Sequence, residues 1–296
     1  MLTRRTDLAL EARELLGNAV ELEGVESSET WERGFRLTTV RVTNSAGAEA
    51  LGKPIGVYHT LDLNGLGRRE EGAFPRAVAA LAGILKPLLP EGDQAVMVVG
   101  LGNRAITPDA VGPKATDRTL VTRHLIDMAP EHFSSFRPVS ALAAGVLGTT
   151  GIESGEIAQA VCAQTRPAAI IAVDALAARR VERLCATVQV CDAGIAPGSG
   201  VGNHRFALNE ESMGVPVIAV GVPTVVDGAT LCADLLEETG REMDSEELAK
   251  LPGASLMVTP RDIDQRVEDM SKVIGYGVSL ALQPGLDLED LEGLIE

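Results

Sequence analysis

The stretch Ala95-Val-Met-Val-Val-Gly-Leu-Gly-Asn103, followed by Thr107-Pro-Asp109, decides the fold, because an apolar strand here runs into glycines and then into a carboxylate. A second apolar strand, residues 168–173, ends directly on Asp174. In open α/β sheets reactive groups gather beyond the carboxyl ends of the strands, so we expect Asp109 and Asp174 to converge on one crevice. An aspartate after a strand also caps helices or closes turns, and each residue alone leaves that alternative open.

The rest of the chain after Ala95 alternates short apolar strands with helical stretches. This pattern predicts βαβ units, and therefore an α/β fold with a mostly parallel twisted sheet flanked by helices. Further strands are expected at 188–191, 215–220 and 256–258, and helices near 117–127, 156–164 and 229–239. For the last long helix we expect Thr259 as cap, Pro260 at the first position, and a buried stripe. The stripe comprises Ile263, Val267, Met270, Ile274 and Val278.

The N-terminal third reads differently. A helical stretch lies near residues 8–16 within an acidic lead-in of about thirty residues. Alternating apolar residues at 35–42 and 55–63 predict a small β-hairpin region whose turn is Asn44-Ser-Ala-Gly47. A core-facing helix follows, with apolar residues at helical spacing between positions 78 and 88.

Composition excludes several classes of protein. The 296 residues carry a net charge of −16, which argues against nucleic acid as a partner. No apolar run approaches the ~18 residues of a membrane span, and the N-terminus lacks a secretory pattern, so we expect a cytoplasmic protein without a membrane anchor. The four cysteines form no C-x-x-C pair and the histidines no H-E-x-x-H pattern, which predicts reduced cysteines and no structural zinc.

Two glycine-rich loops suggest a competing function, a nucleotide- or phosphate-binding α/β domain. Residues 100–105 nominally match the dinucleotide fingerprint, but Pro108 and Pro113 interrupt the following chain and Asp109 would repel a phosphate. Residues 198–202 lack the lysine of a P-loop.

An aspartate pair has a concrete chemistry. Two neighbouring carboxylates do not both ionise cheaply, so one can deprotonate a water while the other donates a proton to an amide. Backbone amides of residues 100–103 or 198–202 are candidate oxyanion donors. Alternatively the carboxylates hold a divalent metal, and the sequence does not decide between these mechanisms. His124 and Glu153 are candidate supporting groups, although a packed histidine and a helix-cap acid are equally ordinary readings.

Many ordered blocks of the chain together resemble the germination protease (spore protease) family of endospore-forming bacteria. The blocks include Arg5-Thr-Asp-Leu-Ala-Leu10, Val99–Asn103, Thr107-Pro-Asp-Ala-Val-Gly-Pro113, Leu120-Val-Thr-Arg-His-Leu125, Gly148-Thr-Thr-Gly-Ile-Glu153, Val173-Asp-Ala-Leu-Ala-Ala-Arg179, Gly194–Asn203, Gly214–Asp227 and Leu256-Met-Val-Thr-Pro260. The match runs from Arg5 to about Leu282.

The resemblance implies an aspartic-type endopeptidase, a hydrolase that degrades small acid-soluble spore proteins in the spore core during germination. It places the catalytic pair on Asp109 and Asp174. Gly102, Asn103 and Gly200, which belong to the two glycine-rich loops, are possible supporting positions on account of their backbone amides. It also implies a homotetramer, no obligatory cofactor, and a fold similar to the hydrogenase-maturation peptidases, which use a metal. A divalent metal is therefore not excluded.

Family members are made as inactive precursors and cut after an acidic residue that precedes a large apolar residue and alanine. Thr6-Asp7-Leu8-Ala9 fits this preference, so we expect self-processing between Asp7 and Leu8, a propeptide at residues 1–7 and one peptidase domain at 8–296. The propeptide is short, and the region 241–256 is shorter than in the longer family members. Three cations near the motifs are candidates for binding the acidic side chain: Arg104, Lys114 and Arg123.

Overall fold

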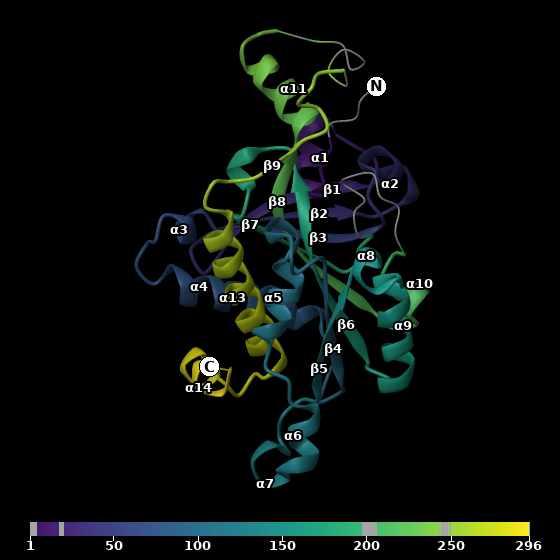
Figure 1. The fold of residues 1–296 in the computed structure, drawn as a ribbon, viewed down its shortest axis with the longest axis vertical. Helices are drawn as coiled ribbons and strands as arrows, with labels where there is room; N and C mark the ends of the chain where they lie inside the picture. Colours follow the sequence, from purple (N-terminus) through teal and green to yellow (C-terminus); the bar gives the residue numbers. More distant parts are fainter. Residues whose placement is uncertain are drawn as a thin grey trace.

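One open sheet of nine strands organises the chain (Figure 1). The computed structural model describes residues 5–17, 21–196, 206–241, 243, 248 and 250–295. The strand order is β1-β2-β3-β7-β8-β6-β4-β5, and β9 pairs with β8. The strands are β1 (Val25–Glu32), β2 (Phe35–Val42), β3 (Gly56–Asp62), β4 (Val96–Leu101), β5 (Val139–Gly145), β6 (Ala169–Ala178), β7 (Thr187–Cys191), β8 (Val217–Asp227) and β9 (Met257–Val258).

The prediction of a mostly parallel sheet is wrong. Only the pairs β4·β5, β4·β6 and β6·β8 are parallel, whereas the pairs formed by β1, β2, β3, β7 and β9 are antiparallel. The cause is an N-terminal meander that joins the parallel strands through β7. Apolar alternation identified β2, β3 and β7 as strands, but the direction of a strand is set by its distant partner and not by its own residues. The acidic strand β1 lies at the sheet edge with mostly exposed side chains and was not predicted.

The expected hairpin between β2 and β3 is present as antiparallel pairing, but a helix replaces its turn. Asn44 caps α2 (Ser45–Leu51) through a hydrogen bond of 2.9 Å from the Gly47 amide to its side-chain oxygen. Gly52 ends this helix in the left-handed region at φ +62°. Asn44 and Gly47 thus begin a helix here, because the same side chain that stabilises turns also satisfies a helix N-terminus.

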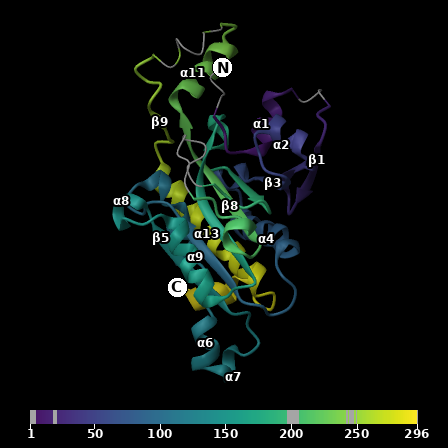
Figure 2. The same ribbon diagram turned by 90° about the vertical axis from the view of Figure 1, so that its right-hand side faces the viewer.

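Helices cover both faces of the sheet (Figures 1 and 2). One face packs against the helices α4 (Ala73–Leu85), α5 (Val111–Asp117), α13 (Ile263–Leu282) and α14 (Leu288–Ile295). The other packs against α1 (Ala9–Leu15), α2, α9 (Ser154–Thr165) and α10 (Glu210–Met213). The remaining helices are the short α3 (Asn64–Gly67), α6 (Arg123–Met128), α7 (Pro130–Phe133) and α8 (Leu147–Thr150), and α11 (Gly228–Glu238) beyond β8. Among the helices of the described residues, none has the length and apolarity to cross a membrane.

Helix α13 carries the predicted stripe, and all five of its residues are buried. Its start differs from the prediction, because the helix begins at Ile263 with Asp262 as N-cap and no side-chain cap bond, so Thr259 and Pro260 precede it. The expected helix at 117–127 is replaced by two short helices, α5 and α6, which a loop at 118–122 separates. Helix α5 therefore begins two residues after Asp109 in spite of Gly112 and Pro113, because both fit its first turn.

Candidate active site

Asp109 is folded back over the end of β4. It closes a short 3-10 helix, η2 (Thr107–Asp109), and its Oδ2 accepts a hydrogen bond of 2.7 Å from the Asn103 amide. Gly102 permits this approach, because a Cβ there would lie 2.1 Å from the Asp109 carbonyl oxygen and its φ of +111° disfavours other residues. The carboxylate thus occupies an amide that a phosphate would need, which weakens the nucleotide-binding alternative.

Asp174 lies inside β6 rather than at its end, because the strand continues to Ala178. It is 5% exposed, and its Oδ1 accepts a hydrogen bond of 2.9 Å from the Ala175 amide. Asp174 and Asp109 line the same cavity of about 290 Å³, together with Gly102 and Ser154. The structure therefore brings the two predicted aspartates to one crevice beyond β4 and beside β6.

A second, smaller cavity of about 130 Å³ is also lined by Asp174. Asp174 of β6 and Gln189 of β7 both pair with Gly221 of β8, so the three residues form one row across the sheet. Side chains in register on neighbouring strands point to the same face, and the Leu176 side chain packs over the glycine between them, since a Cβ at Gly221 would lie 2.4 Å from Leu176 Cδ1. Lys53 and Tyr58 complete the polar wall of this cavity.

Asp7 lines both cavities, and so the N-terminal segment lies along β6 beside Asp174. The Asp7 amide donates to the Ala177 carbonyl (2.9 Å), and the Ala177 amide donates to Asp7 Oδ2 (2.8 Å). Gln189 contacts the segment twice, since its Nε2 donates to the Asp7 carbonyl (3.3 Å) and its Oε1 accepts from the Ala9 amide (2.8 Å). Leu8 is fully buried in an apolar cluster with Leu176 and its neighbours.

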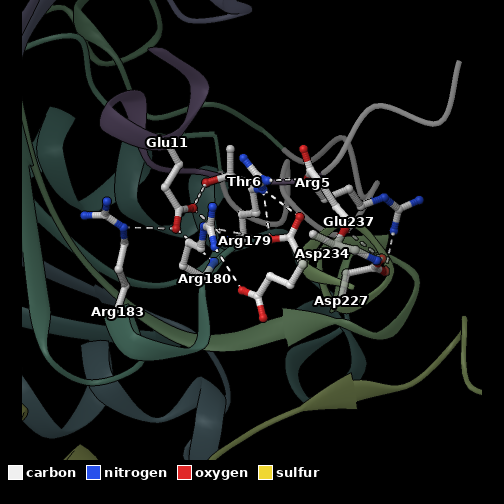
Figure 3. A network of polar contacts seen from close by, with 11 residues as sticks. Arg5, Thr6, Glu11, Arg179, Arg180, Arg183, Asp227, Asp234 and Glu237 are labelled. Carbon is white, nitrogen blue, oxygen red and sulfur yellow. Dashed lines mark hydrogen bonds and ion pairs between the residues drawn. The ribbon is translucent and has the colours of Figure 1, made fainter. Parts of the chain in front are cut away.

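A polar network fastens this segment to the far end of β6 (Figure 3). The fully buried Glu11 accepts hydrogen bonds from the Arg179 and Arg180 amides (2.7 and 2.9 Å) and lies 3.2 Å from Arg183 Nε. Thr6 also donates to Glu11. Burial raises the pKa of Glu11, and these hydrogen bonds and the Arg183 charge oppose that shift.

The same network reaches helix α11. Arg179, which is 6% exposed, places its Nε 2.8 and 2.9 Å from the two carboxylate oxygens of the buried Asp234. Arg5 lies 3.6 Å from Asp227, the N-cap of α11, and its amide donates to Thr230 (3.2 Å). Residues 5–11 are therefore held at one end by Arg5 against helix α11 and at the other by Glu11 at the end of β6 (Figure 3).

Several predicted site residues lie elsewhere. His124 is exposed and lies in the first turn of α6. Thr122, the N-cap of this helix, accepts a hydrogen bond from the Val139 amide at the start of β5. His124 therefore lies at the end of the sheet opposite the aspartates. Glu153 is the N-cap residue of α9 and adjoins the cavity only through the following residue, Ser154. Gly200 and the whole loop at 198–202 lie outside the described residues.

The three cations expected to bind an acidic side chain do not line either cavity. Arg104 pairs with Asp117, Lys114 lies 2.8 Å from Glu268, and Arg123 begins α6 at the far end of the sheet. These positions are near the motifs in sequence, but the chain turns them toward helices α5 and α13 or away from the crevice.

Three site residues were missed: Lys53, Gln189 and Thr224. Thr224 is the extra residue of β8 at a register shift against β6, is 1% exposed and lines the larger cavity. Its hydroxyl has no hydrogen-bond partner among the described residues. A polar residue inside an apolar strand was a signal for Gln189 and Thr224, because buried polar groups are normally partnered. Lys53 gives no local signal.

The described residues contain no group of three side chains arranged to hold a metal ion. All four cysteines are free thiols, as the sequence predicted. Burial raises the pKa of Cys191 to about 11 and that of Cys185 to about 12, so neither is an activated nucleophile.

Comparison with known proteins gives a consistent answer. A model of the germination protease family matches residues 5–250. The chain is 42% identical to the germination protease of Clostridium perfringens over 317 residues, which cover 97% of each chain. It is 38% identical to the germination protease of Priestia megaterium and 37% identical to that of Bacillus subtilis, in both cases over 97% of this chain and 95% of the relative.

Proposed function

Because this chain belongs to the germination protease family and is therefore a protease, we propose that it is an aspartic-type endopeptidase whose catalytic groups are Asp109 and Asp174. One observation carries the proposal: both carboxylates line one cavity, and a stretch of peptide from the same chain lies in that cavity through Asp7.

The proposed reaction is the addition of water to an amide carbonyl. One aspartate, ionised, takes a proton from the water as its oxygen attacks the carbonyl carbon. The other, protonated, donates its proton to the carbonyl oxygen. The first aspartate then passes the proton it took from the water to the leaving nitrogen, and the second takes its own proton back as the C–N bond breaks and the carboxyl product forms. Thr224 lines the same cavity, and its buried hydroxyl has no hydrogen-bond partner among the described residues, which makes it a candidate to hold the water or the peptide.

The first bond cut is the Asp7–Leu8 bond of the chain itself, which makes residues 1–7 a propeptide and the intact chain a zymogen. Gln189 supports this choice, because its Nε2 donates to the Asp7 carbonyl, which belongs to that bond. Its Oε1 accepts from the amide of Ala9, the residue after Leu8. A side-chain amide aimed at a carbonyl oxygen stabilises the negative charge that develops there during attack. In this role Gln189 replaces the backbone amides expected from the glycine loops.

The external substrates are small acid-soluble spore proteins, cut after Glu or Asp before a large apolar residue and alanine. The family resemblance supports this substrate, a homotetrameric assembly and action in the spore core during germination. The zymogen would then protect these proteins until the segment in the crevice is removed.

The proposal is tested by following the intact mass of the full-length chain during incubation, with and without a chelator. Loss of residues 1–7 in the wild type, abolished in both Asp109→Asn and Asp174→Asn and insensitive to chelator, supports aspartic chemistry. Asp127→Asn is the matched control, because Asp127 is exposed on α6 at the far end of the sheet. A small acid-soluble spore protein added to the processed enzyme then tests the substrate.

A metal-dependent mechanism, as in the hydrogenase-maturation peptidases, is the second candidate, and the same experiment separates it. A cut that chelator abolishes and added divalent metal restores makes the aspartates metal ligands. A wild-type chain that leaves both itself and the spore protein whole contradicts the proposed function.

A further inference from the structure

Among the residues that the structure describes, Lys53 is the basic side chain that lines the smaller of the two cavities, and no basic side chain lines the larger one. It follows Gly52, which ends α2, and precedes Pro54, so its backbone is held between α2 and β3. Its Nζ donates to the Thr6 carbonyl at 3.1 Å and thus reaches the segment one residue before Asp7. The cavity it lines contains both Asp7 and Asp174.

Burial lowers the pKa of Lys53, and the charges of Asp7, Cys191 and Glu11 oppose this shift. The Cys191 thiol, with a pKa of about 11, is neutral at pH 7, which leaves the two carboxylates as the compensating charges. A buried ammonium is costly unless an anion accompanies it. The segment that carries Asp7 therefore stabilises the charged form of Lys53.

The Asp7 carboxylate is recognised from two directions. Its Oδ2 accepts the Ala177 amide at 2.8 Å, and the positive charge of Lys53 acts on it from the wall of the cavity. An amide and an ammonium together form the donor set that a carboxylate prefers. When residues 1–7 are removed, the Ala177 amide and the Lys53 ammonium both lose the Asp7 carboxylate. A carboxylate of the substrate can then take its place.

We infer that Lys53 and the Ala177 amide form the subsite that selects an acidic side chain in the substrate, and that Asp7 fills this subsite in the intact chain. The inference rests on the proposed function, since it takes Asp7 to be the residue before the bond that is cut. It assigns the acid preference to a lysine that lies more than 50 residues before the first catalytic aspartate. It also gives the precursor a reason to be inert toward other acidic peptides, because the subsite is already occupied.

The test is a double-mutant cycle in the full-length chain, with the rate of cleavage after residue 7 measured by intact mass. The variants are Asp7→Asn, Lys53→Met and the double variant, and Lys86→Met is the control because Lys86 is exposed directly after α4 and lines neither cavity. We expect Lys53→Met to slow cleavage about ten- to hundredfold when residue 7 is aspartate, and to have little further effect when it is asparagine. Lys86→Met is expected to leave the rate within about twofold.

A second cycle measures thermal unfolding in the Asp174→Asn background, in which the chain stays whole. We expect the Tm cost of Lys53→Met to be larger when Asp7 is present than in the Asp7→Asn variant, by roughly 2 to 4 °C. Equal effects of Lys53→Met in both backgrounds, in either cycle, overturn the inference while leaving the peptidase activity in place. If Lys53 and Asp7 are coupled in thermal unfolding but the wild type cleaves no bond after residue 7, the proposed self-processing is wrong. The assignment of the subsite is then wrong as well, because it takes Asp7 to be the residue before the cleaved bond.

Discussion

Gly112 packs helix α5 closely against β4, which leads to Asp109, and β6, which carries Asp174, so an alanine at this position should disturb both stability and catalysis. The residue lies in α5, three positions after Asp109, against the ends of β4 and β6. An added Cβ would be 2.3 Å from the Leu101 carbonyl oxygen and 2.4 Å from the Val173 carbonyl oxygen. Both contacts are with strand backbone, and real Cβ atoms essentially never come closer than 3.0 Å, so the helix must move by about 0.7 Å.

This displacement has a predictable size in two measurements. Overpacking of a close-packed contact costs about 1–3 kcal/mol, so urea unfolding of Gly112→Ala should show a free energy of unfolding lower by that amount. Helix α5 carries Asp109 with it, and misplacement of a catalytic group by about 1 Å costs roughly a hundredfold in rate. The rate of cleavage between Asp7 and Leu8 in the full-length chain is the assay.

Gly83→Ala in α4 is the matched control. An added Cβ there meets only the flexible end of the Glu32 side chain, at 3.3 Å, so the change should stabilise the helix by up to about 1 kcal/mol and leave the rate unchanged. Wild-type stability and wild-type cleavage in Gly112→Ala would refute the reasoning, since the helix would then have no need of a glycine between the two aspartates.

Three further predictions use other parts of the molecule. Thr224→Val removes the unpartnered hydroxyl, so the protein should be as stable as the wild type or up to about 1 kcal/mol more stable, but should cleave at least about tenfold more slowly. Thr224→Ser keeps the hydroxyl and should keep most of the rate. An equal loss of rate in both variants would contradict a role for the hydroxyl. For Glu11, burial raises the pKa, so the folded chain holds the proton more tightly than the unfolded chain and loses stability as the pH rises from roughly 4.3 through the folded pKa. Glu11→Gln lacks this loss, so the free energy of unfolding of the variant, relative to that of the wild type, should be higher at pH 7 than at pH 4.5 when both are measured by urea unfolding. A change in the opposite direction would disprove the raised pKa. Iodoacetamide at pH 8 should modify the partly exposed Cys232 within minutes and spare Cys191 and Cys185 until the chain is unfolded, as read by peptide mass.

The parts of this structure that the sequence predicts are those with a local cause. Strand β4 and the aspartate after it, the buried stripe of α13 and helix α9 follow from apolar spacing alone. The direction of the antiparallel strands does not, because β3 pairs with β7 over 125 residues, with Asp62 opposite Thr187. Pairing at such separation depends on the register of the whole sheet, which no window of sequence contains.

The same limit explains which site residues could be found. Asp109 and Asp174 stand next to their own strands, so a rule about strand ends located them, although Asp174 lies within β6. Lys53 acquires its proposed role only when α2 and β3 bring it to Thr6, 47 residues earlier, in the segment that hydrogen-bonds to β6. Arg104, by contrast, is near the motif in sequence and pairs with Asp117, so proximity along the chain was a poor guide to charge placement.

The two kinds of strand divide the work of the proposed site. The parallel strand β6 carries Asp174 and the parallel strand β4 leads to Asp109, whereas the antiparallel strand β7 places Gln189 in one row with Asp174 and Gly221. If the strand in the position of β7 were parallel to β8, a crossover helix would have to connect the two strands. That helix would cover the face of the sheet that bears the smaller cavity. The antiparallel β7 leaves that face open for the N-terminal segment, whose backbone then bonds to β6 and to Gln189. The departure from the predicted topology therefore leaves room for a peptide beside Asp174, so the proposed peptide site depends on the antiparallel strands.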